Sequence, residues 1–178
     1  MKKTVIEIDL MNKNSVKNAL KELRAYKHRF DQRVKIFVER LGIEGLREVK
    51  THITAYDAID TQELLNSIWL NDGGRRRNGW HCVYVIADSP HACFVEFGTG
   101  IVGKAMPYNF DFPKGVSWNY DVGKSIFTTK DGRRGWIYTK DGEHFYFTSG
   151  QESRPFMAQS MVALMDKVDA IAEEVFNE

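Results

Sequence analysis

The sequence predicts an α+β fold: a long N-terminal amphipathic helix and a C-terminal helix pack on an antiparallel β-sheet, from which a β-hairpin insertion protrudes. Three observations predict it. Apolar residues recur at four-three spacing near both ends of the chain, short aromatic and β-branched runs lie between them, and Asp-Gly pairs interrupt residues 103–150. The 178 residues are expected to form a single domain, 1–178, with the insertion at about 103–150.

Composition and charge narrow the functional classes. A hydrophobic content of 43% and a charged content of 28% are ordinary for a soluble globular protein. The net charge of +1 argues against a strong overall hold on nucleic acid. No apolar run is long enough to span a bilayer, and the start at Met1 lacks the apolar core of a signal peptide, so a cytoplasmic site of synthesis is expected. Cys82 and Cys93 are expected to be buried free thiols.

The pattern of residues in the N-terminal third predicts a strand followed by a helix. Alternating residues from Thr4 to Leu10 indicate a half-buried strand, and the polar run at 12–15 offers a helix cap. Apolar positions from Val16 to Leu41 then follow the helical period, until Gly42 and Gly45 break the phase and a second helical piece begins. This stripe packs on the protein's own sheet or, less commonly, forms a coiled-coil seam.

The middle of the chain predicts a meander of strands. Asp60 or Thr61 caps a short helical turn that leads into a strand from Ile68, and a strand from Trp80 to Ala87 returns after a loop. The stretch from His91 to Gly100 alternates as a third strand and ends at a glycine turn.

Glu96 lies between two phenylalanines of this stretch, just before the turn. A buried carboxylate must be hydrogen-bonded or paired. It therefore satisfies nearby backbone N–H groups, faces solvent, or contacts another subunit. A catalytic role is the weakest alternative, because no partner acid, base or nucleophile is evident beside it.

Residues 103–150 lose helical periodicity and are rich in aromatics. We expect strands near 124–129, 135–139 and 144–148, joined by tight turns at Asp131-Gly132 and Asp141-Gly142. Their aromatic side chains either complete the core or form a patch that a neighbour covers. Ser153 as a cap and Pro155 near the first turn then open a C-terminal helix that runs to the end of the chain.

Catalytic signatures are missing from the sequence, and an enzyme is not expected. It has no Gly-x-Ser-x-Gly, no phosphate-binding Walker loop and no paired histidines at helical spacing. A zinc site of His81, Cys82, His91 and Cys93 is disfavoured, because adjacent strand residues point to opposite faces. We expect no metal and no cofactor.

Two groups of arginines fall at expected turn tips. They are solvated loop charges or, in the functional alternative, contacts to DNA phosphate or to an acidic partner. The first group is Arg75, Arg76 and Arg77, and the second is Arg133 and Arg134. If several copies formed a ring, these tips could line a channel through which DNA passes.

Three short motifs in order carry a resemblance to a known family. They are Asp60-Thr61-x-x-Leu64-x-Asn66-Ser67-Ile68, then Phe94-Val95-Glu96-Phe97-Gly98-Thr99-Gly100, then Arg154-Pro155-Phe156-Met157. Over roughly 16–176 the chain resembles the tail-component family of long-tailed bacteriophages (head–tail joining, neck or tail-completion proteins), the gene-ten-like group of the HK97-type phages.

The resemblance implies a virion or prophage structural protein without catalysis. Such a protein assembles in the host bacterial cytoplasm as an oligomer, expected to be a ring that forms on its own or only on assembly, and contacts other neck or tail proteins. No membrane is involved. A nucleic-acid-binding module that uses the arginine tips is the alternative. The residues expected at the subunit interface are Glu96, Phe97, Gly98, Thr99, Trp118, Trp136, Tyr138, Phe145 and Phe147.

Overall fold

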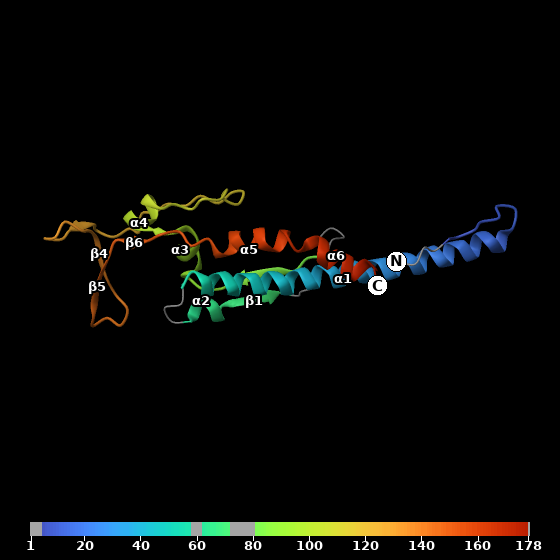
Figure 1. Cartoon of the computed structure of the whole chain (residues 1–178), viewed down its shortest axis with the longest axis horizontal. Coiled ribbons are helices and arrows are strands. Elements are labelled where there is room, and N and C mark those ends of the chain that lie inside the picture. The colour runs from blue at the N-terminus through green and yellow to red at the C-terminus, as the bar shows by residue number, and fades with distance from the viewer. Residues whose placement is uncertain (1–4, 58–61, 72–80, 178) are drawn as a thin grey trace. The chain divides into compact units, whose positions relative to one another are not determined.

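The α+β class is confirmed by the computed structural model, which describes residues 5–57, 62–71 and 81–177 (Figure 1). Six helices and six short strands are found in those ranges. The helices are α1 (Lys13–Ala55), α2 (Glu63–Asn66), α3 (Ala92–Phe97), α4 (Gly100–Ala105), α5 (Phe156–Met165) and α6 (Val168–Asn177). The strands are β1 (Ile68–Asn71), β2 (Tyr84–Ala87), β3 (Phe127–Thr128), β4 (Arg134–Thr139), β5 (Phe145–Thr148) and β6 (Gly150–Gln151).

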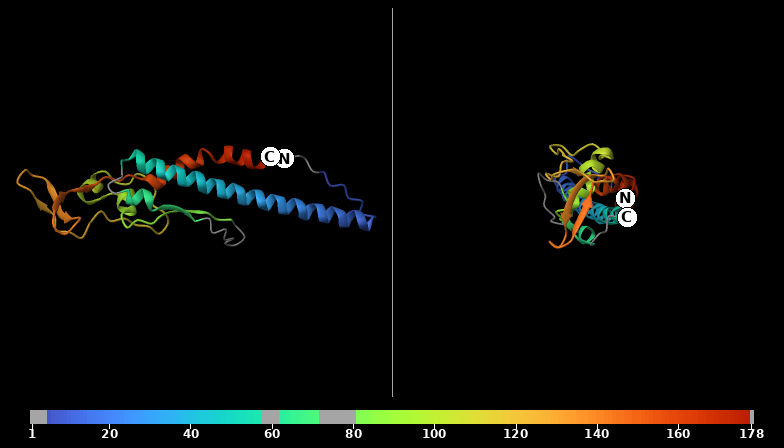
Figure 2. Two further views of the ribbon diagram at one scale, coloured as in Figure 1. Left: turned by 90° about the horizontal axis from the view of Figure 1, so that it is seen from below. Right: turned by 90° about the vertical axis from the view of Figure 1, so that its left-hand side faces the viewer.

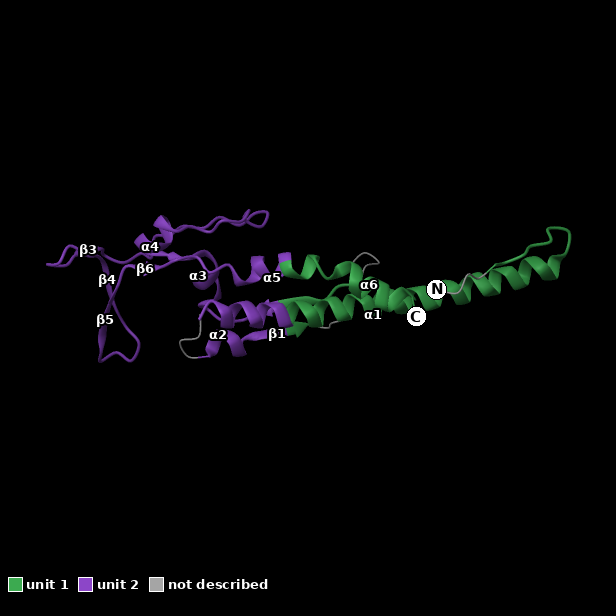
Figure 3. Ribbon diagram, viewed as in Figure 1, with its two compact units in different colours: residues 1–46, 70–85, 163–178 green, residues 47–69, 86–162 purple. Residues whose placement is uncertain are grey.

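The contacts divide the chain into two compact units (Figure 3). Unit 1 comprises 1–46, 70–85 and 163–178, and unit 2 comprises 47–69 and 86–162. The boundary falls within α1, β1, β2 and α5, so each of these elements contributes residues to both units. The single domain expected from the sequence stays a prediction.

The long helix α1 begins where its cap was expected and runs without interruption for 43 residues (Figure 2). The Asn12 carboxamide oxygen accepts hydrogen bonds from the backbone N–H groups of Asn14 (3.0 Å) and Ser15 (3.4 Å). The predicted break at Gly42 and Gly45 is wrong. A Cβ at Gly42 would lie 2.4 Å from a Val83 methyl carbon, so this glycine gives room for a close neighbour. Its cost of about 1 kcal/mol in a helix does not end a helix of this length.

The strand predicted from Thr4 to Leu10 is also wrong over its described part. Residues 5–10 have no strand partner and lead into a turn in which the Asn12 N–H bonds to the Asp9 carbonyl at 3.1 Å. Leu10 and Met11 are exposed. Alternation stabilises a strand only where a sheet edge is available to pair with it, and here none pairs with it.

The strands at 68–71 and 84–87 confirm the predicted pair, which forms a two-stranded sheet. The second sheet has the order β3-β4-β5 and is antiparallel, as predicted for the insertion. Both Asp-Gly turns are found there, with Gly132 and Gly142 at φ +83° and +81°. The proposed caps at Asp60 and Thr61 lie outside the described residues.

Two predictions of secondary structure need correction. The stretch predicted as a strand around Val95 forms the short helix α3. The single C-terminal helix is divided into α5 and α6 by a turn at Asp166 and Lys167. No glycine or proline marks that turn and the apolar spacing continues across it, so the sequence carries no signal for it.

Each unit has its own apolar contacts. In unit 2, Ile53 and Phe156 are the largest fully buried side chains (0% and 1% exposed), together with buried Val49, Leu64, Ile68 and Ala92. In unit 1, Phe176 of α6 lies against Phe30 and Phe37 of α1, with ring centroids 5.8 Å apart in both pairs. An ion pair between Lys167 and Glu44 (2.6 Å) joins the same two parts of this unit.

Candidate functional site

Glu96 is a buried acidic residue of unit 2 at which two segments distant in the sequence meet. It lies in α3, is 6% exposed, and accepts hydrogen bonds from the backbone N–H groups of Met157 (2.8 Å) and Ala158 (3.1 Å). These are first-turn donors of α5, which have no partner within their own helix. A negative charge is also favoured at a helix N-terminus by the helix dipole. Glu96 therefore caps α5 from a segment about 60 residues earlier in the chain.

Backbone contacts join the same two segments. The Arg154 N–H donates to the Val95 carbonyl (2.8 Å), and the Ser153 hydroxyl donates to the Glu96 carbonyl (2.6 Å). Isolated antiparallel bridges pair Thr99 with Gln151 and Gly100 with Gly150. We call residues 95–100 and 150–158 the motif junction, because it brings the second and third sequence motifs together. Ser153, expected to cap the helix, instead fixes the backbone of α3.

The glycine turn after Glu96 is required by close packing. Gly98 has φ +80°, and a Cβ there would lie 2.7 Å from the Ser153 nitrogen. Both the conformation and the space exclude a side chain without a shift of backbone. Gly100 has φ +64°, and a Cβ there would lie 2.6 Å from a ring carbon of Trp136.

Burial dominates the electrostatics of Glu96. It raises the pKa of the Glu96 carboxyl above its ordinary value, against the two backbone hydrogen bonds, which lower it. Two phenols also respond to this carboxylate. Burial raises the pKa of Tyr56 and of Tyr108, and the charge of Glu96 raises each further. One alternative left open by the sequence, that Glu96 satisfies backbone N–H groups, is thus confirmed, although from a helix and with donors far away along the chain.

An aromatic cluster covers the other side of α3. Phe97 lies 5.0 Å from Tyr108, 5.4 Å from Phe112 and 5.1 Å from Trp118, measured between ring centroids. The Trp118 indole N–H donates to the Gly98 carbonyl at 2.8 Å. Trp118 and Phe97, both expected at a subunit interface, are therefore used within the chain. No pattern in the sequence predicted that Tyr108 and Phe112 belong to this cluster.

The sheet β3-β4-β5 leaves apolar side chains exposed. Strand β4 pairs with β5 in the register Trp136–Thr148, Ile137–Phe147, Tyr138–Tyr146 and Thr139–Phe145. Phe145 is 72% exposed, and the exposed apolar residues of the sheet and its entry are Ile126, Phe127, Ile137, Tyr138, Phe145 and Tyr146. Phe147 is half-buried between Phe127 and the guanidinium of Arg133, and Trp136 is buried (8% exposed). Strand β5 is at the edge of the sheet, with one side of its backbone unpaired in it.

Of the two arginine groups predicted at turn tips, the structure describes only the second. Arg75, Arg76 and Arg77 lie outside the described residues. Arg133 follows the first Asp-Gly turn, where its side chain bonds to Asp131 (2.6 Å) and lies 5.1 Å from the Phe147 ring centroid. Arg134 begins β4 and is exposed. Asp131, with a pKa lowered first by Thr129 and then by Arg133, already neutralises one of these two charges.

Within 5–57, 62–71 and 81–177, no three His, Cys, Asp or Glu side chains lie where they could share a metal ion. Cys93 is exposed and Cys82 half-buried, so the expectation that both free thiols are buried is wrong. No helix in the described part of the chain is both long and apolar enough to cross a bilayer.

Comparisons with protein-family models, with curated proteins and with solved structures find no match. The function must therefore be argued from the motifs and from the geometry of the two units.

Proposed function

We propose that this chain is a structural protein of a tailed bacteriophage or prophage, which acts in head–tail joining or tail completion by assembling with copies of itself and with neighbouring neck or tail proteins. In this role it neither forms nor breaks covalent bonds. The observation that carries the proposal is the exposed apolar surface of the sheet β3-β4-β5.

That surface suits a partner that binds as a strand. Edge strand β5 presents unpaired backbone groups, and Phe145 (72% exposed) and Tyr146 (43% exposed) lie on it. Incoming chains can add a strand to such an edge, with backbone hydrogen bonds for affinity and side-chain pockets for specificity. In a closed ring of identical copies, the edge of one copy would meet a different surface of the next. A stable contact buries on the order of 1,000 Å² or more.

The motif junction supports the same proposal in a different way. The second and third motifs of the phage resemblance are the two segments that meet through Glu96, so their spacing has a structural reason in this chain. Because Glu96, Phe97 and Gly98 are used inside unit 2, we place the contacts between copies on the hairpin residues Ile137, Tyr138, Phe145 and Tyr146.

The test is a pair of charge-introducing variants. Phe145→Asp changes an exposed side chain of the sheet, and Val116→Asp changes an exposed apolar side chain of the same unit outside it. The sizes of each protein, alone and mixed with the proteins encoded by adjacent genes, are measured by native mass spectrometry and sedimentation.

We expect wild type and Val116→Asp to form the same oligomer or mixed complex, and Phe145→Asp to remain a folded monomer. The proposal fails if wild type joins no complex under either condition, or if Phe145→Asp assembles as well as wild type. A turnover that disappears when one side chain is changed would also contradict it.

A further inference from the structure

The first half of α1 is strongly cationic, although the whole chain is nearly neutral. Residues 13–30 contain six lysines and arginines and a single carboxylate, Glu22, whereas the net charge of the chain is +1. The excess is therefore local, and the overall charge conceals it.

Four of these cations lie on one face of the helix. Lys13, Lys17, Lys21 and Arg24 are spaced by four, four and three residues, which places them in one row along α1. All four are exposed, and His28 extends the row by one more turn. Successive members are about 4.5–6 Å apart along the axis at 1.5 Å per residue. We call these four residues the basic stripe.

The stripe is not neutralised within the described part of the chain, where none of its members has an ion pair. Ion pairs further along α1 include Lys35 with Glu39 at 3.5 Å and Arg40 with Glu174 at 3.0 Å. Four long side chains therefore keep their charges available over about three turns of helix.

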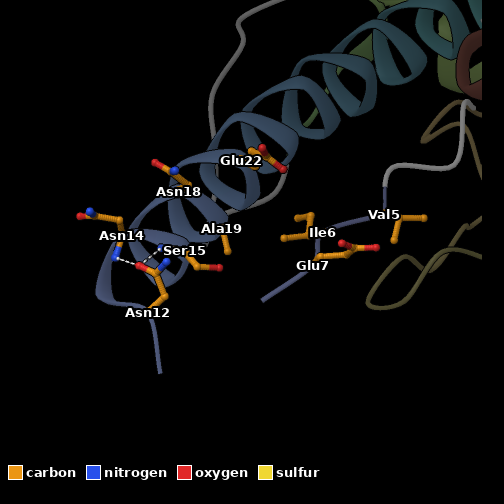
Figure 4. Close-up of a pocket in the computed structure, with 9 residues that line it drawn as sticks. All are labelled: Val5, Ile6, Glu7, Asn12, Asn14, Ser15, Asn18, Ala19 and Glu22. Carbon is orange, nitrogen blue, oxygen red and sulfur yellow. Dashed lines mark hydrogen bonds between the residues drawn. The ribbon is translucent and has the colours of Figure 1, made fainter. Parts of the chain in front are cut away.

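The N-terminal segment lies over a different face of α1. Val5, Ile6 and Glu7 face a hollow whose other wall is formed by Asn14, Ser15, Asn18, Ala19 and Glu22 (Figure 4). At 100° per residue, the centre of that wall is turned more than a quarter of a revolution away from the stripe. Helix α6 contacts a further set of positions, including Phe30 and Phe37. Neither the described part of the N-terminal segment nor α6 therefore contacts α1 along the basic stripe.

We propose that the basic stripe binds the phosphate backbone of nucleic acid. A straight row of flexible cations without carboxylates between them matches a linear array of phosphates and reads no base sequence. A helix that binds a membrane surface needs bulky apolar groups beside its cations. Leu10 and Met11 are exposed just before the helix, and Leu20, Leu23 and Phe30 are exposed along its first half. Of these three helix residues only Leu20 lies beside the row, because at about 100° per residue Leu23 and Phe30 are turned more than a quarter of a revolution away from it. This inference goes beyond the assembly role and does not depend on it.

Four phosphate contacts set the size of the effect. The logarithm of the binding constant falls with the logarithm of salt concentration with a slope of about −0.9 per contact, so about −3.6 in total. Between roughly 50 and 200 mM salt, affinity is then expected to fall on the order of a hundredfold.

The experiment measures fluorescence anisotropy of a labelled DNA duplex of about 20 base pairs, longer than the stripe, which spans on the order of 20 Å. The test variant carries Lys13→Gln, Lys17→Gln, Lys21→Gln and Arg24→Gln, which preserve helix propensity. The control removes the same charge from exposed residues of unit 2 through Lys104→Gln, Lys114→Gln, Lys124→Gln and Lys130→Gln. A third variant, Lys17→Arg with Lys21→Arg, keeps the charge.

We expect wild type, the control and the charge-keeping variant to bind with the steep salt slope, and the stripe variant to lose most of that slope and at least tenfold in affinity at low salt. Equal losses in the stripe variant and the control would overturn the proposal, because net charge alone would then explain binding. So would stripe-dependent binding to phosphatidylserine vesicles without duplex binding, or salt-insensitive self-association through this helix. No binding by folded wild type would also overturn it.

Discussion

Replacing Glu96 with alanine tests whether the motif junction holds unit 2 together. The carboxylate is 6% exposed and accepts two backbone hydrogen bonds, so Glu96→Ala leaves two partly buried N–H donors at the start of α5 without their acceptor. Each unsatisfied donor costs about 1–3 kcal/mol, and relief of the buried charge offsets part of this. We expect a net loss of about 2 kcal/mol in the free energy of unfolding near neutral pH.

The loss should depend on pH, in a direction that the structure fixes. The pKa of Glu96 is raised above its ordinary value of 4.5, so the folded chain binds that proton more tightly than the unfolded chain. The stability that this proton contributes is fully present below pH 4.5 and is lost as pH rises through the raised pKa. The difference between wild type and Glu96→Ala should therefore be largest in acid and narrow as pH rises through this window.

Two measurements check this prediction. Urea unfolding followed by circular dichroism at several pH values gives the stability difference. Hydrogen exchange at the amides of Met157 and Ala158 reports the junction directly, and a loss of about 2 kcal/mol corresponds to about thirtyfold faster exchange. The matched control is Glu152→Ala, which removes a partly exposed glutamate with only a long ion pair to Arg154 (3.8 Å) and should cost less than about 1 kcal/mol.

The reasoning is refuted if the gap between wild type and Glu96→Ala widens as pH rises, because the two hydrogen bonds would then outweigh burial in setting the pKa. Unchanged exchange at Met157 and Ala158 would refute it as well, since the carboxylate would not be capping α5.

Two further predictions concern glycine and aspartate turns. Gly98→Ala should cost at least about 1 kcal/mol more than Gly115→Ala, measured by urea unfolding, because both have φ near +80° but only Gly98 is packed against backbone; equal losses would show that the close approach relaxes freely. The pKa of Asp141 is lowered to about 2 by hydrogen bonds from the backbone N–H of His144, then from the His144 side chain and from the backbone N–H of Glu143. In a carboxyl NMR titration of His144→Ala, we expect this pKa to rise but to stay below its ordinary value. An unchanged pKa would mean that the His144 side chain contributes nothing.

The sequence predicted elements well where local patterning decides them. The strands of the insertion followed from aromatic alternation between two Asp-Gly turns, and α1 from its apolar period and the cap at Asn12. Gly42 shows the limit of such reasoning. A glycine that breaks a pattern and one that admits a neighbouring side chain look the same until the neighbour, here Val83, is known.

The stretch from Ala92 to Phe97 was misassigned because it fits two periods. Alternation separates Ala92, Phe94 and Glu96 from their neighbours, which predicts a strand. In the helix, Ala92 and Glu96 lie four residues apart on the buried face, and Phe94 and Phe97 both contact Trp118. Contacts with α5 and with the segment around Trp118 favour the helix over the strand. These contacts cannot be inferred from the six residues alone. Burial of Glu96 could be suspected from its two phenylalanine neighbours, but not which N–H groups satisfy it.

The motif junction also separates folding from assembly. Glu96 and Gly98 belong to the motif that carries the phage resemblance. Both are hydrogen-bonded within the chain, Glu96 to α5 and Ser153 and Gly98 to Trp118. Phe145 and Tyr146, in contrast, are exposed on an edge strand and can contact another copy. If contacts between copies used the motif itself, Glu96→Ala would abolish assembly in a folded chain, whereas Phe145→Asp would leave assembly intact. If the hairpin carries them, Glu96→Ala should lower stability first and assembly only through unfolding, whereas Phe145→Asp should abolish assembly at unchanged stability. Measuring unfolding and oligomer size on the same two variants therefore decides which surface joins the copies.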